Sequence, residues 1–279
     1  MGTSTRFGGP NSGLVPSWAD DPSPATAPAP GQPPSGSPIA PDRTPPPSAP
    51  QVVPADSGSF RSARTSFNKF AQSGDRRDLG NSLSNYVRSG TGGARGAARR
   101  MGASRSAGAR LLGFVRNVES FGAAIALQRF NLASLASRPA AEVFMALMDF
   151  ICPPGGALDE AIARQAMLDA ISDFADAGMD DFGAMSEAER REFFLDFIIR
   201  SIEGRIIADM ATRGMARSAS VEAMEDMQEQ LHDFVAGHTR GALAPLLDGP
   251  IHSDVEMMDM IDSIYEAGFE LISLMGEDE

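Results

Sequence analysis

Two residue pairs in this chain have a spacing that enzymes use for catalysis. Ser66 and Lys69 form S-x-x-K, in which the serine is the nucleophile of some acyl-transfer enzymes. The K-T-G motif that accompanies it there cannot occur here, because Lys69 is the only lysine. Glu229 and His232 form E-x-x-H, half of a di-iron carboxylate site, but neither other histidine has an acid three residues before it. Both pairs therefore predict surface helices.

The remaining candidates for chemistry are isolated residues. Asp180-Asp181 could ligate a divalent cation, although an exposed turn or helix cap is the more ordinary interpretation. Cys152 lies between Ile151 and Pro153 and is expected to be a small buried residue. One cysteine excludes a disulfide framework or a Cys-cluster metal site, and the chain has no GxxxxGK[ST] phosphate loop. The sequence thus predicts a protein that is not an enzyme and has no metal site.

Five arginines lie among glycines and other small residues in the middle of the chain: Arg95, Arg99, Arg100, Arg105 and Arg110. Arg95 and Arg99 are four residues apart and share a face if this segment is helical. Such a cluster could bind the phosphates of a nucleic acid or nucleotide. It could also dock on the acidic C-terminal half of the chain or on an acidic partner. The net charge of −21 over residues 118–279 favours docking over nucleic-acid binding, and the sequence leaves both open.

The N-terminus offers a different kind of chemistry. Gly2 permits removal of Met1, which exposes an unhindered glycine α-amine with a reference pKa of about 8. A useful fraction of that amine is unprotonated and nucleophilic near neutral pH. N-myristoylation requires Ser or Thr at position 6, and Arg6 breaks that pattern.

The residues behind Gly2 predict a segment that docks on a partner. Thr3, Ser4 and Thr5 are small enough to form a thin thread that enters a narrow channel, and Gly8-Gly9-Pro10 can turn. The chain's only tryptophan follows within an apolar group that could anchor on a partner surface: Leu14, Val15, Pro16 and Trp18. The alternative interpretation is an ordinary disordered N-terminus.

The elements that must position these residues differ in composition along the chain. Residues 1–54 hold 15 of the 20 prolines and cannot bury enough apolar surface to offset their ordering entropy. We therefore expect a docking motif over 1–18 and a disordered, proline-rich linker over 19–57. Residues 58–117 form a basic Gly/Arg-rich helical region, and residues 118–279 an acidic helical domain with a net charge of −21.

After residue 57 the apolar residues follow a helical period, which predicts an all-α bundle or array behind the N-terminal arm. Pro139 is expected at the first position of one helix, and Ser186 with Glu189 as a capping box that opens another. The other expected helices are 59–72 (ended by Gly74), 75–88, 103–118, 157–177, one capped by Ser218 or Ser220, and one that begins with the capping box of Ser253 and Glu256.

Many of the fifteen methionines lie on these helical stripes. They are expected to fill the core, and a Met-rich groove for a partner helix is the alternative. The chain has neither a run of eighteen apolar residues nor a secretory signal peptide. We therefore expect a cytoplasmic protein without membrane contact.

Several segments together resemble the QatB family of the bacterial Qat anti-phage defence system. The most specific are the opening string of residues 1–5, Gly8-Gly9-Pro10, and the Leu-Val-Pro-x-Trp string of residues 14–18. The basic middle, with its strings at 86–90 and 98–102, and the acidic helical end extend the similarity over most of the chain.

The resemblance implies a four-component operon that encodes an ATPase, this protein, a QueC-like (QatC-like) enzyme and a TatD-like nuclease. In that family the QueC-like enzyme is implicated in attaching a 7-deazaguanine group to a protein N-terminus. Gly2 matches the required position once Met1 is removed. ATP and the 7-deazaguanine donor would be bound by the partner enzyme, and this chain would have no cofactor of its own.

Overall fold

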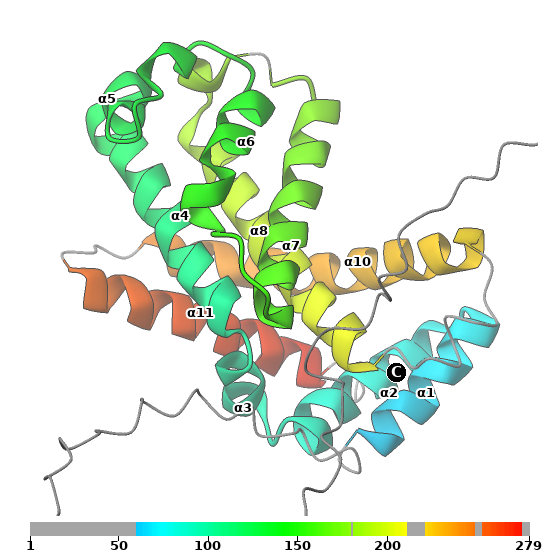
Figure 1. Cartoon of the computed structure of the whole chain (residues 1–279). Coiled ribbons are helices and arrows are strands. Elements are labelled where there is room, and N and C mark those ends of the chain that lie inside the picture. The colour runs from blue at the N-terminus through cyan, green and yellow to red at the C-terminus, as the bar shows by residue number, and fades with distance from the viewer. Residues whose placement is uncertain (1–59, 180, 211–220, 249–252, 275–279) are drawn as a thin grey trace, which may run out of the picture. The chain divides into compact units, whose positions relative to one another are not determined.

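The computed structural model of the chain describes residues 60–179, 181–210, 221–248 and 253–274. Every regular element in these residues is a helix and none is a strand, which confirms the predicted all-α class (Figure 1). All of them belong to one compact unit. The helices longer than one turn are α1 (Arg61–Ser73), α2 (Arg76–Asn85), α3 (Ala94–Arg99), α4 (Gly102–Phe121), α5 (Ala123–Gln128), α6 (Ala140–Ile151), α7 (Leu158–Asp176), α8 (Glu187–Met210), α10 (Val221–Leu243) and α11 (Asp254–Leu274).

Short elements connect these helices. They are a π-helical turn, η1 (Tyr86–Gly90), and three short 3-10 segments: η2 (Ala133–Leu135), η3 (Phe182–Ala184) and η4 (Ala244–Asp248). In the part of the chain that the structure describes, no helix is both long enough and apolar enough to cross a membrane.

Most helix boundaries follow from local sequence. Gly74 ends α1 in the left-handed conformation, with a φ of 67°, and Asp75 caps α2 by accepting a hydrogen bond from the Arg77 N–H at 2.9 Å. Both bonds of the predicted capping box between Ser186 and Glu189 are present. Ser253 Oγ accepts the Glu256 N–H at 3.2 Å.

Three expectations about the helices need correction. Pro139 precedes α6 rather than occupying its first position, because its ψ of 138° is extended. The predicted helix over 75–88 changes at Tyr86 into the π-helical η1. Helix α3 lies in the segment between the expected helices over 75–88 and 103–118, for which no helix was predicted. The expected caps Ser218 and Ser220, together with Asp180, lie outside the described residues.

Helix α8 is the centre of the core. It is buried on nearly all sides, including Phe193, Phe194 and Phe197, and it packs against α7, α10 and α4. Phe193 stacks on Phe144 of α6 with ring centroids 3.7 Å apart. A Cβ on Gly108 of α4 would lie 3.4–3.5 Å from side chains of α8 and α11, at van der Waals contact, so these three helices pack closely at this position.

The basic and acidic regions pack on each other. Helix α11 contacts α2, α3 and α4, which come from the basic region. Figure 1 shows α11 beside α4 and α3. The compositional boundary between residues 117 and 118 lies within α4, a continuous helix. The tertiary contacts therefore join the two regions that composition separates.

Candidate functional site

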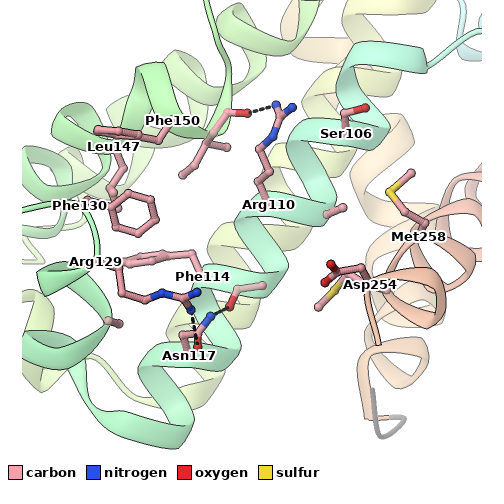
Figure 2. Close-up of a pocket in the computed structure, with 15 residues that line it drawn as sticks. Ser106, Arg110, Phe114, Asn117, Arg129, Phe130, Leu147, Phe150, Asp254 and Met258 are labelled. Atoms are coloured by element: carbon pink, nitrogen blue, oxygen red, sulfur yellow. Dashed lines mark hydrogen bonds between the residues drawn. The ribbon is translucent and has the colours of Figure 1, made fainter. Parts of the chain in front are cut away.

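A groove with a volume of about 700 Å³ runs along one face of α4 (Figure 2). One wall comes from α5 and α6, and the other comes from the start of α11. Its lining is mostly apolar and includes Phe114, Phe130, Phe150 and Met257. The complete lining is Ser106, Ala109, Arg110, Gly113, Phe114, Asn117, Ala126, Arg129, Phe130, Leu147, Phe150, Ile151, Asp254, Met257 and Met258.

Two exposed arginines lie in this groove, and both bind neutral acceptors. Arg110 Nη1 donates to the Ile151 carbonyl at the end of α6, at 3.1 Å. Arg129 Nη1 donates to Asn117 Oδ1 at 3.3 Å (Figure 2). Asn117 in turn donates from Nδ2 to the Gly113 carbonyl at 2.7 Å, which fixes its amide for the arginine. The groove thus combines an aromatic wall with two cations that have no carboxylate partner among the described residues.

The other arginines of the predicted cluster have different surroundings. Arg95 pairs with Glu266 at 3.4 Å, and Arg105 forms a short ion pair with Asp262; both acids lie on α11. Arg100 binds Asp209 of α8 at 3.0 Å. Docking on the acidic half of the chain is therefore what the structure shows for these three. The exposed Arg99 has no ion pair with any described residue.

Asp209 is the centre of a network that joins several helices. Its carboxylate accepts hydrogen bonds from Arg100, Arg205 and the Tyr86 hydroxyl, the last at 2.9 Å. Its backbone carbonyl accepts two bonds from Arg64. Burial and the adjacent carboxylate raise the pKa of Tyr86, so this hydroxyl stays a hydrogen-bond donor. The network attaches α1, η1 and α3 to the end of α8.

The two residues of the E-x-x-H pair, which predicted a surface helix, lie on α10, where Glu229 is exposed and His232 is half-buried. His232 binds across to Glu203 of α8, with Nδ1 3.2 Å from Oε2, rather than to Glu229 on its own helix. Among the described residues, no three His, Cys, Asp or Glu side chains are grouped so that they could hold a metal ion. Ser66 is half-buried and Lys69 is exposed on α1.

The pair of Glu203 and His232 predicts a stability that depends on pH. Burial raises the pKa of Glu203, and the hydrogen bond to Glu203 raises the pKa of His232. A pKa that is higher in the folded state means that folding binds protons, so both groups contribute stability that is lost as pH rises through the raised values. We expect the unfolding free energy to fall as pH rises from about 6 to 8, and His232→Gln to flatten this slope. Urea titrations across that range measure it, and an equal slope in wild type and variant would contradict the assignment.

Cys152 is buried, as predicted. Its Sγ lies 3.6 Å from the Ala163 carbonyl, and burial raises the pKa of the thiol to about 11. At neutral pH the thiol is therefore protonated and weakly nucleophilic. Asp181, in the pair considered as a cation site, caps η3 by accepting the Gly183 N–H at 2.9 Å, which agrees with the cap interpretation for that residue.

The sequence of residues 92–272 matches the family model described as Qat anti-phage system associated protein QatB. The chain belongs to the QatB family. No curated protein and no solved structure shows significant similarity to it.

Membership of the QatB family gives the chain a role in the Qat anti-phage system and implies partners within that system. The QatB match includes every residue that lines the groove. It leaves out residues 1–91, which include α1 and α2.

The N-terminal site that the sequence predicts lies outside both the QatB match and the described residues. It comprises Gly2, Thr3, Ser4, Thr5, Gly8, Gly9, Pro10, Leu14, Val15, Pro16 and Trp18. A Met-rich groove for a partner helix was the alternative interpretation of the methionine stripes, but neither the position of this groove nor its aromatic lining was predicted. Its only sequence signals were Arg110, which was assigned to the basic cluster, and the pair Met257-Met258 on a methionine-rich stripe.

Proposed function

We propose that this chain is a non-enzymatic component of a cytoplasmic Qat defence complex and is itself a substrate. Its Gly2, freed by removal of Met1, is presented to the QueC-like enzyme of the system for ATP-dependent conjugation of a 7-deazaguanine group. The observation that carries the proposal is the combination of a QatB-family body with an N-terminal string that a plain linker does not need. That string places a small, unhindered amine ahead of an apolar anchor that contains the chain's only tryptophan.

The chemistry is an acyl transfer. The enzyme uses ATP to activate a carboxylate of the 7-deazaguanine donor, a step that normally precedes attack by ammonia. The Gly2 α-amine takes the place of ammonia: its nitrogen forms a bond to the acyl carbon, the activating group leaves, and the amine loses a proton. The product is an amide at the N-terminus. The partner supplies the ATP site and the donor site, and this chain supplies the nucleophile.

Each part of the N-terminal segment has a distinct role in the proposal. Thr3, Ser4 and Thr5 line the enzyme channel through backbone and hydroxyl hydrogen bonds. Leu14, Val15, Pro16 and Trp18 dock on the enzyme surface and provide binding energy away from the reacting amine. The helical body binds the other components, among which the ATPase and the TatD-like nuclease are candidates.

The body itself supports a binding role rather than a catalytic one. Its single thiol, Cys152, is buried and has a raised pKa. Its arginines Arg95, Arg100 and Arg105 neutralise carboxylates within the chain. This internal pairing also weighs against the alternative of a nucleic-acid-binding adaptor that uses Arg95–Arg110.

The mass of the N-terminal peptide tests the proposal. The chain is produced with and without the QueC-like enzyme, and a mass increase on Gly2 is expected only when the enzyme is present. We expect Gly2→Ala to abolish this increase, because the added methyl group crowds the attacking amine although Met1 is still removed. An N-terminal extension should abolish it as well, since it displaces the amine.

Gly31→Ala, the same substitution in the proline-rich segment, is the matched control and should be modified normally. Unchanged thermal unfolding of the Gly2→Ala variant would show that the body is intact. An unmodified Gly2 in the presence of the enzyme, or normal modification of the Gly2→Ala variant, would refute the proposal.

A further inference from the structure

One face of α4 forms the floor of the groove over three helical turns. The α4 residues that line it have the spacing of a single helix face and are Ser106, Ala109, Arg110, Gly113, Phe114 and Asn117. This stripe is about 16 Å long at 1.5 Å per residue. Ala109 and Gly113 on this stripe are small, so a second helix could approach the α4 backbone closely beside them. No described helix fills this position.

The walls present apolar surface that is only partly covered. The Phe150 side chain of α6 is 50% exposed, and its ring centroid lies 5.0 Å from that of Phe130. Met257 and Met258 of α11 also line the groove, and Figure 2 shows Met258 on the side opposite Phe150. Methionine side chains adapt to the shape of a bound surface. Covering an exposed aromatic ring removes apolar surface from water and so stabilises the complex with a partner. The groove therefore has the composition of a protein-binding site.

The charges in the groove indicate the partner's chemistry. Nine other described arginines pair with carboxylates. Arg110 and Arg129 instead bind a backbone carbonyl and an amide oxygen. Asp254, on the α11 side, is the only acid among the lining residues. Two cations between apolar walls, with one acid among the lining residues, favour a ligand that brings carboxylates.

We propose that this groove binds an acidic amphipathic helix from another protein component of the Qat complex. Asn117 accepts a hydrogen bond from Arg129, so it marks the position of that arginine along α4. Arg110 and Asn117 are seven residues apart on α4, about 10 Å along its axis. A helix that lies along α4 therefore presents acidic residues at positions i and i+7. Its apolar residues, at i+3 and i+4, cover Phe130 and Phe150. The inference rests on membership of the QatB family and not on modification of Gly2.

Site-specific photocrosslinking in the assembled complex tests the proposal. p-Benzoylphenylalanine replaces Phe150 in the full-length chain, and the same residue at Met258 probes the opposite wall. The matched control replaces Phe121, which is 60% exposed and does not line the groove. We expect positions 150 and 258, but not 121, to crosslink to one partner segment with carboxylates and apolar residues at the predicted spacing.

Charge reversal then tests the role of the arginines. Arg129→Glu is expected to weaken binding of the crosslinked partner roughly tenfold, because an attraction becomes a repulsion. An acid-to-arginine change in the partner helix should restore it. Arg99→Glu, at an exposed arginine outside the groove, is the control and should have little effect.

Several results would overturn the inference. They are the absence of a crosslink from both groove positions, crosslinks of equal yield from position 121, and crosslinking to a basic segment, to nucleic acid or to a small molecule. An unmodified Gly2 with intact groove crosslinks would refute only the proposed modification. Normal modification without these crosslinks would refute only the groove.

Discussion

Asp209→Ala is expected to lower the unfolding free energy by about 3–5 kcal/mol, the usual cost of removing one partner from a buried ion pair. Its carboxylate is 10% exposed and binds Arg100, Arg205 and the Tyr86 hydroxyl. Without it, Arg100, whose side chain is 24% exposed, keeps a partly desolvated charge near a second arginine, Arg205. Urea denaturation at neutral pH, followed by circular dichroism, measures the change.

A second acid provides the control for this prediction. Asp262 also pairs with an arginine, Arg105, but its side chain is 43% exposed. Water screens that pair, so Asp262→Ala should cost at most about 1 kcal/mol. Equal losses in the two variants would show that the Asp209 network does not join the N-terminal helices to α8 as described. Replacing both Asp209 and Arg100 by apolar residues should recover part of the loss, because no unpaired charge stays behind.

Phe193→Ala is expected to have an effect of similar size, about 3–5 kcal/mol, because it leaves a cavity in the centre of the core. Phe193 is fully buried on α8. Its ring stacks on Phe144 at 3.7 Å and meets the edge of Phe174 at 5.0 Å. The substitution removes contacts to α6 and α7 together, so neither helix can close the cavity without moving relative to the other.

Phe121→Ala is the matched control for the core prediction. The Phe121 side chain is 60% exposed at the end of α4, and its removal should change the unfolding free energy by less than about 0.5 kcal/mol. Urea denaturation of the two variants gives the comparison. A loss of less than about 1 kcal/mol for Phe193→Ala would indicate a core that repacks around the cavity, contrary to the close packing described for α8.

Local features of the sequence were sufficient to predict most of the helices. Gly74 and Asp75 lie where one helix ends and the next begins, and Ser186 with Glu189 forms the box that opens α8. Helix ends can be predicted from such residues because the capping groups lie within a few residues of the backbone atoms that they bind. The π-helical η1 was not predicted, because long-range contacts such as that of Tyr86 with Asp209 help to fix its position.

The predictions for the N-terminal amine and for Cys152 depend only on residues that are close in sequence. The prediction for Gly2 needs only the order of the first residues, since an N-terminal amine and a nearby apolar anchor are properties of the chain itself. It stays a prediction, because those residues lie outside the described structure. The burial of Cys152 was also predicted from its apolar neighbours and is confirmed.

The roles of the arginines depended on the tertiary structure. Arg95, Arg105 and Arg110 have similar sequence surroundings, yet the first two pair with α11, whereas Arg110 faces a groove with no carboxylate partner among the described residues. Sequence alone determined an all-α protein with a basic middle, an acidic end and a distinctive N-terminus. Which charges are neutralised, and where apolar surface is left uncovered, depends on contacts between residues more than a hundred positions apart, and only the packing of the helices decides those contacts.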